Sequence, residues 1–167
     1  MRMEGQDLYL GNYVSRLDAK GRVSIPAPFR ALLAKDGYEG LFVHPSLDVE
    51  AVDCGGHALL RELNMLLDTY PPYTEERDTL SRALLGDSER LKVDPEGRVS
   101  LTESCKLRAG ISTEVAFVGM GHKFQIWEPE RFRAQQDEAR SRARDLRKLS
   151  GASGAAGHRP PPHGARE

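Results

Sequence analysis

The sequence predicts an α+β fold that is rich in β structure, arises from an internal duplication and carries flanking helices. The segment LDAKGRVSIP at residues 17–26 recurs as VDPEGRVSLT at residues 93–102. Each copy has short β-prone runs around a turn, and a leucine-rich stretch with helical spacing lies between the copies. Two copies 76 residues apart fit a duplicated module better than a solenoid, which needs more repeats.

Each copy is expected to begin with a β-hairpin. In the first copy the strands are Tyr13–Leu17 and Arg22–Ile25, around Asp-Ala-Lys-Gly. Asp at the first turn position and Gly at the last are typical of a type I turn, and Gly21 can adopt a positive φ. The second copy reads Asp94-Pro95-Glu96-Gly97, with proline where its fixed φ suits the same turn.

A short helix and two further strands complete each copy. Pro26 and Pro28 suit the first turn of a helix in the first copy, and Thr102 and Gly110 are a suitable cap and stop in the second. The further strands are expected near 40–44 and 48–53 in the first copy, and near 114–119 and 123–127 in the second.

The rest of the chain is expected to be helical or disordered. Leucines at helical spacing precede Pro71-Pro72, and Thr74 is expected to cap a second helix. The tail has no Val, Ile, Leu or aromatic residue and cannot offset its ordering entropy. The expected segments are 7–54 and 89–128 for the two copies, 55–88 for a helical insert, 129–149 for a final helix and 150–167 for a disordered tail.

Charge is distributed unevenly along the chain. The net charge of −1 does not predict nucleic-acid binding, but residues 14–35 carry five cations against Asp18 alone. Residues 129–167 carry nine Lys and Arg against five acids. The basic final helix has two open interpretations: it touches DNA phosphates, or it is a solvated face on an oligomer-forming helix.

The first hairpin holds the candidate functional residues. Arg22 presents a forked set of donors that matches guanine or a phosphate, and a two-stranded ribbon fits the major groove of DNA. Asp18 has two possible roles: its carboxylate can accept hydrogen bonds that hold the turn, and it can orient the guanidinium of Arg22. The two roles are compatible. Cations in the hairpin and in the helix after it are expected to cluster around this pair: Arg16, Lys20 and Arg30.

The second copy is a weaker candidate. Glu96 stands where the first copy has Lys20, and residues 88–108 carry a balance of only +1. Asp94 and Arg98 are the counterparts of the first motif pair. If both hairpins contact nucleic acid, the first is expected to dominate.

Other function classes lack the residues they need. Cys54 and Cys105 are far apart with no CxxC, which favours packing in a reducing compartment over a disulfide or a metal site. Asp48, Glu50 and Asp53 fit a solvated strand face. No enzyme motif, cofactor or small-molecule substrate is indicated, and no apolar run suggests a membrane span or a secretory signal. A small hydrolase using Asp or His is a further alternative.

The duplicated motif resembles a known family. DAKGRVSIPAPFRALL and DPEGRVSLTESCKLRAG resemble AbrB-type swapped-hairpin DNA-binding domains. Two such copies around a helical insert resemble the MraZ family of bacterial transcriptional regulators over about residues 7–148.

That resemblance implies a double swapped-hairpin barrel that assembles into a homo-oligomeric ring. It also implies a cytoplasmic, nucleoid-associated repressor that binds tandem promoter repeats upstream of its own gene, at the head of a division and cell-wall cluster. By position, the resemblance implies DNA contacts from five first-copy residues and one second-copy residue: Arg16, Asp18, Lys20, Arg22, Arg30 and Arg98. Thr102 departs from the proline at position 26, which weakens the second copy's match. The alternative function is an oligomeric interaction scaffold without specific DNA binding.

Overall fold

The fold is of the predicted α+β class. The structure is a computed structural model that describes residues 7–157, with side chains described through Gly151. Helices separate consecutive pairs of strands along the chain, and every strand pair in this range is antiparallel. Both sequence copies fall in one compact unit that ends at Pro129, and the final helix forms a second unit.

The two copies build one sheet together. Strand β1 of the first copy pairs with β7 of the second, and β4 of the first pairs with β8 of the second. The six-stranded sheet has the order β1-β7-β8-β4-β3-β5. Its strands are β1 (Asn12–Arg16), β3 (Leu41–Pro45), β4 (Val52–Gly55), β5 (Glu89–Leu91), β7 (Glu114–Gly119) and β8 (Phe124–Trp127).

A second, two-stranded sheet joins the two hairpins. Strands β2 (Arg22–Ser24) and β6 (Arg98–Ser100) pair with Val23 opposite Val99. The Ile25 amide donates to the Gly97 carbonyl at 3.0 Å, and the Leu101 amide donates to the Gly21 carbonyl at 3.3 Å. These are the same positions in each copy, so the hairpins exchange equivalent bonds about an approximate two-fold axis.

Each hairpin is followed by a helix, as the sequence predicts. Helices α1 (Ala27–Asp36) and α4 (Glu103–Ala109) both end at a left-handed glycine. The Thr102 side chain caps α4 by accepting from the Cys105 amide. The insert forms α2 (His57–Asp68), α3 (Glu75–Ser81) and a π-helical turn, η2 (Arg82–Gly86).

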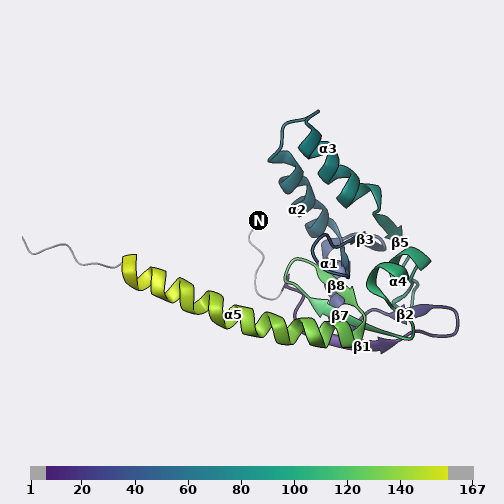
Figure 1. Cartoon of the computed structure of the whole chain (residues 1–167). Coiled ribbons are helices and arrows are strands. Elements are labelled where there is room, and N and C mark those ends of the chain that lie inside the picture. Colours follow the sequence, from purple (N-terminus) through teal and green to yellow (C-terminus); the bar gives the residue numbers. More distant parts are fainter. Residues whose placement is uncertain (1–6, 158–167) are drawn as a thin grey trace, which may run out of the picture. The chain divides into compact units, whose positions relative to one another are not determined.

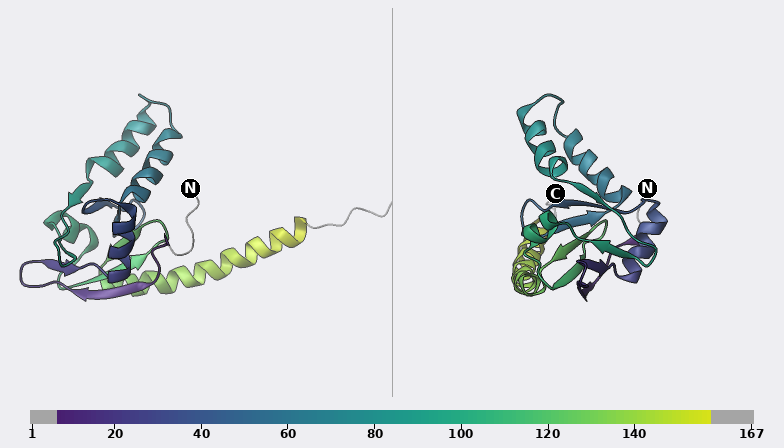
Figure 2. Two further views of the ribbon diagram at one scale, coloured as in Figure 1. Left: turned by 180° about the vertical axis from the view of Figure 1, so that it is seen from behind. Right: turned by 90° about the vertical axis from the view of Figure 1, so that its right-hand side faces the viewer.

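Two apolar clusters hold the first unit together. The larger lies between the sheet, the hairpins and α1, and includes the fully buried rings of Phe29, Phe117 and Phe124. The smaller packs Phe42 against α2 and so anchors the insert, which rises from the sheet as an antiparallel helix pair (Figure 1). The β1–β2 loop extends from the edge of this unit, as Figure 2 shows from behind. The first hairpin tip is therefore available to a partner.

Three features of the fold differ from the sequence prediction by more than a residue at a strand end. Strand β4 begins at Val52 because residues 46–51 form a loop closed by the Ser46 amide on the Ala51 carbonyl. Strand β5 was not predicted, since three residues carry too little alternation.

The final helix α5 (Pro129–Gly157) continues through 150–157, which were expected to be disordered. Propagating a formed helix is cheaper than starting one, and no proline interrupts this sequence before residue 160. The expected disorder of 158–167 lies outside the described residues. Within the described range, no helix combines the length and apolar character needed to cross a membrane.

Candidate nucleic-acid interface

The tip of the first hairpin is tied together by Asp18. Its Oδ1 accepts from the backbone amides of Lys20 and Arg22, each at 2.9 Å. Gly21 closes the turn at a φ of 76° and donates its amide to the Asp18 carbonyl. The Arg22 backbone hydrogen bond is the main cause that lowers the pKa of Asp18, so the carboxylate is ionised at neutral pH.

The same carboxylate orients Arg22. Arg22 Nε donates to Asp18 Oδ2 at 2.8 Å, which fixes the plane of the guanidinium. The side chain is 28% exposed, so it is not sealed inside the protein. Within the described part of the chain, its two terminal nitrogens have no hydrogen-bond partner. They form the edge of the fork that can donate in parallel to guanine O6 and N7 or to a phosphate.

Two further cations lie around this pair. Arg16 is exposed at the end of β1, opposite Glu114 in the sheet register, and Lys20 is exposed in the turn. Together with Asp18 and Arg22 they give the first tip a formal charge of +2. The structure therefore brings together four of the six predicted DNA-binding residues.

The second tip repeats the geometry but not the charge. Asp94 Oδ1 accepts from the amides of Glu96 and Arg98, and Asp94 Oδ2 accepts from Arg98 Nε at 2.8 Å. Glu96 Oε2 lies 3.2 Å from Arg98 Nη2. The hydrogen bond that Arg98 donates to the Asp94 carboxylate is the largest cause that raises the pKa of Arg98, and the nearby Glu96 adds to it. With Lys92 in the position of Arg16, the second tip is neutral.

Arg30 lies at the second hairpin, so the expectation that it clusters with Arg22 is wrong. Arg30 Nη1 donates to the Glu96 carbonyl at 3.1 Å, and the side chain crosses the α-carbon of Gly97. The reason is that the helix of the first copy packs on the turn of the second copy.

Lys106 takes the corresponding place at the first hairpin. Its Nζ lies 3.9 Å from the point where a Cβ on Gly21 would sit, and it forms an ion pair with Glu103 at 2.7 Å. The 76-residue offset makes Lys106 the second-copy counterpart of Arg30, but sequence reasoning did not place it at the first hairpin. The missing information was which copy's helix packs on which turn.

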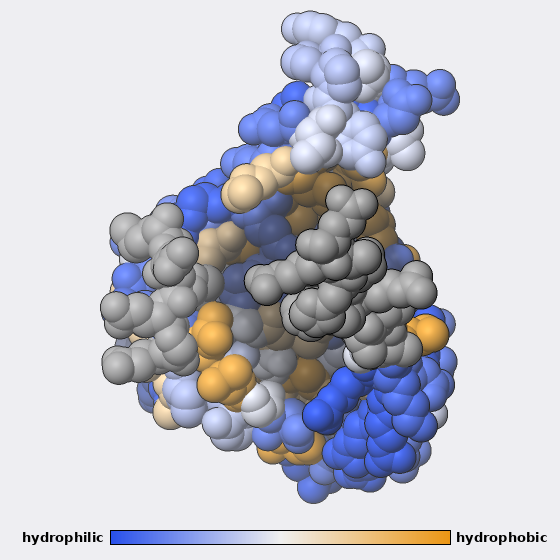
Figure 3. Space-filling view, turned by 90° about the vertical axis from the view of Figure 1, so that its left-hand side faces the viewer, coloured by the Kyte–Doolittle hydropathy of each residue, from blue (hydrophilic) through white to orange (hydrophobic). Residues whose placement is uncertain are grey.

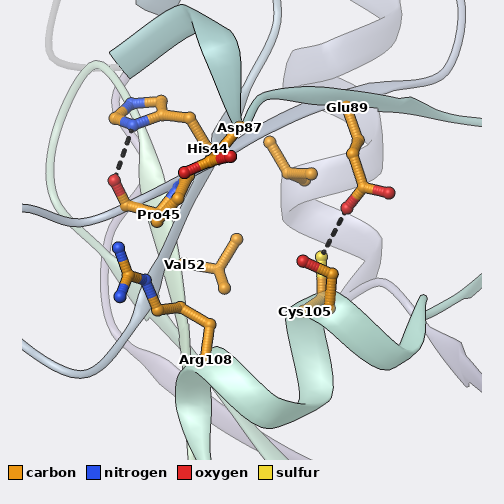
Figure 4. A pocket seen from close by; sticks show the side chains of 9 residues that line it. His44, Pro45, Val52, Asp87, Glu89, Cys105 and Arg108 are labelled. Carbon is orange, nitrogen blue, oxygen red and sulfur yellow. Dashed lines mark hydrogen bonds between the residues drawn. The ribbon is translucent and has the colours of Figure 1, made fainter. Parts of the chain in front are cut away.

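The cavity beside Cys105 does not suit catalysis. Figure 4 shows side chains that line this cavity. Its volume is about 10 Å³, at the lower limit for a single water. Cys105 Sγ donates to Glu89 Oε2, and burial raises the pKa of Cys105 to about 11. A protonated thiol is a poor nucleophile. Within residues 7–157, no group of three or more His, Cys, Asp or Glu side chains could hold a metal ion.

A buried polar row crosses β3, β4 and β8, and it corrects the expectation of a solvated face for Asp53. Asp53 is buried and accepts from Gln125 Nε2 at 2.8 Å and from Lys123 Nζ at 3.1 Å. His44 Nε2 lies 3.5 Å from the same carboxylate, while Nδ1 lies 3.0 Å from the Pro45 carbonyl. Burial lowers the pKa of His44, so it is neutral. The register of strands β3, β4 and β8 brings these side chains together, and their spacing along the sequence does not indicate this contact.

Comparison with known proteins gives consistent matches. The family model described as "MraZ protein, putative antitoxin-like" matches residues 84–149. The transcriptional regulator MraZ of Beijerinckia indica is 64% identical over 163 residues, which cover 96% of this chain and 99% of that protein. The protein of the same name from Methylocella silvestris is 64% identical with the same coverage. That of Rickettsia felis is 36% identical over 141 residues, covering 84% of this chain and 95% of that protein.

Proposed function

The chain belongs to the MraZ family of transcriptional regulators, as the sequence motif predicts, and we propose that it regulates transcription by binding double-stranded DNA sequence-specifically through its first hairpin. The observation that carries the proposal is the guanidinium of Arg22, which Asp18 fixes in orientation through Nε while the side chain stays partly exposed. Because Nε of Arg22 already donates to Asp18, the two terminal nitrogens of the guanidinium keep one orientation before DNA binds. A preoriented fork loses less conformational entropy on binding a base edge.

The two hairpins are proposed to contribute unequally. Lys20 and Arg16 add positive charge around Arg22, and cations of this kind position a protein on the phosphate backbone. At the second tip the Glu96 carboxylate forms an ion pair with Nη2 of Arg98. Because this carboxylate is negative, it would repel a DNA phosphate that approached Arg98. Arg98 and Arg30 therefore make weaker contacts than Arg22 in this proposal.

Several hairpins on one assembly would compensate for weak single contacts. One hairpin reaches few phosphates, and such binding weakens steeply with salt. We infer a homo-oligomer, of the ring type that the family resemblance implies, in which effective concentration raises affinity for tandem repeats. Apolar side chains stay exposed on α2, including Met65 at 71%, and apolar surface is visible below the tip of the helix pair (Figure 3). Such surface is typical of contacts between subunits.

The finer family properties belong to the same proposal. The reciprocal bonds between β2 and β6 support a double swapped-hairpin barrel. Repression of the protein's own division and cell-wall cluster, and a cytoplasmic, nucleoid-associated location, follow from the resemblance rather than from the geometry.

A binding titration tests the proposal. Fluorescence anisotropy at physiological salt compares a duplex from upstream of the protein's own gene with a duplex of the same composition and shuffled order. The proposal expects tight binding to the first duplex, weak binding to the second, and poor binding to a single repeat. Equal affinity for native and shuffled duplexes would refute sequence specificity. No binding to either would favour the interaction scaffold instead.

A further inference from the structure

The final helix carries cations on one side along its exposed length. An α-helix turns about 100° per residue, so five cations between residues 133 and 148 fall within a sector of about 100°. We name this set the α5 stripe; it comprises Arg133, Arg140, Arg144, Arg147 and Lys148, all exposed. Asp137 is the one acid in that sector between these residues, and its contact with Arg140 is long, at 3.8 Å.

The opposite side of the same segment is different. It holds Arg142 together with Glu138 and Asp145, and Arg142 lies 4.0 Å from Glu138. The positive charge is therefore segregated to one side rather than spread around the helix. A helix that merely stays solvated does not need this segregation.

We propose that the α5 stripe is a second DNA-binding surface, which contacts the phosphate backbone without reading bases. This rests on the proposed function and extends it to a residue set outside the hairpins. Arg140 and Arg147 are about 10 Å apart along the axis at 1.5 Å per residue. One DNA strand carries about three phosphates over that length, at 3.4 Å each. Arg140, Arg144 and Arg147 can thus pair with about three phosphates of one strand.

The apolar content of the segment argues against a membrane as the partner. Helices that lie in a membrane interface present a broad apolar face opposite their charges. Here Leu146 and Leu149 are the large aliphatic side chains after Phe132 within the described helix. The stripe therefore fits a polyanion whose charges are regularly spaced rather than a lipid surface.

Salt dependence of binding tests this proposal. The triple variant Arg140→Gln/Arg144→Gln/Arg147→Gln removes three stripe charges, and glutamine preserves helix propensity. The slope of log affinity against log salt is negative, and each lost phosphate contact reduces its magnitude by about 0.9. The magnitude of the slope is expected to fall by about 2.7 per bound subunit, so the variant loses about 40-fold less affinity over a fourfold rise in salt. Native and shuffled duplexes should show the same change, because no base is read.

A matched pair of single variants controls for total charge. Arg144→Gln lies in the stripe and Arg142→Gln lies opposite, and both remove one charge from the same helix. We expect a shallower salt dependence for Arg144→Gln alone, with equal helix content by circular dichroism. Equal slopes for the two variants, or a preference of the stripe for phosphatidylserine vesicles over DNA, would overturn this proposal. Failure of the unsubstituted protein to bind any DNA would overturn the proposed function itself, which is a distinct result.

Discussion

Arg22→Ala should separate DNA binding from folding. The turn is held by Asp18 through the backbone amides of Lys20 and Arg22, and alanine keeps both amides. The lost bond joins two partly exposed side chains, and pairs of this kind contribute little to stability. We therefore expect an unchanged Tm and an unchanged oligomeric mass.

The expected loss of affinity is larger. A bidentate contact from an arginine to a guanine contributes about 1–3 kcal/mol of discrimination. At 1.4 kcal/mol per factor of ten, this corresponds to an increase of about 5- to 150-fold in the Kd for each engaged hairpin. Several engaged hairpins would multiply the effect. Anisotropy titration with the native upstream duplex measures it.

Arg98→Ala is the matched control. It removes the same side chain from the same position of the other hairpin, but Asp94 and Glu96 already hold that guanidinium. We expect a Kd within a few-fold of the unsubstituted protein. The reasoning is refuted if the two variants lose the same affinity, or if Arg22→Ala lowers the Tm as it lowers binding.

The second tip, the Asp18 carboxyl, the Cys105 thiol and Gly40 each give a further test. Glu96→Lys gives the second tip the charge of the first, and should tighten DNA binding and steepen its salt dependence; an unchanged salt slope would contradict this. Because folding lowers the pKa of Asp18, the stability that its carboxylate contributes is complete above the unfolded pKa of about 3.9 and is lost as the pH falls through the folded pKa. The NMR signal of the Arg22 amide should therefore shift only below about pH 4. Cys105, with a pKa of about 11, should resist iodoacetamide at pH 8 in the folded protein and react after denaturation, as measured by mass. Gly40→Ala should cost about 1–2 kcal/mol or more of unfolding free energy in denaturant titration, because Gly40 has a φ of 88° and a Cβ would meet the Leu91 carbonyl.

The hairpins were predictable because their signals are local. Aspartate and glycine at fixed turn positions require one backbone shape, and the second copy repeats the requirement with different residues between them. The capping roles of Thr74 and Thr102 follow the same logic, and both side chains accept the expected amide. These elements need no knowledge of the rest of the fold.

Contacts between the copies were not predictable in the same way. The position of Arg30 depends on which turn α1 packs against, and a helix pattern does not specify its partner. The burial of Asp53 depends on cross-strand neighbours, since β4 lies between β3 and β8. Both outcomes depend on the register of the sheet and on which helix packs on which turn. These features arise from contacts between residues that are far apart in the sequence.

The most direct test of the central claim is photo-crosslinking from the two hairpin tips. A photo-reactive amino acid replaces Lys20 in one protein and Glu96 in another, and each is irradiated with the labelled upstream duplex. Strong crosslinks from position 20 at the repeats, with weak ones from position 96, are the predicted result. Crosslinks from position 96 alone, or from neither tip while the protein still binds the duplex, would contradict the role of the first hairpin.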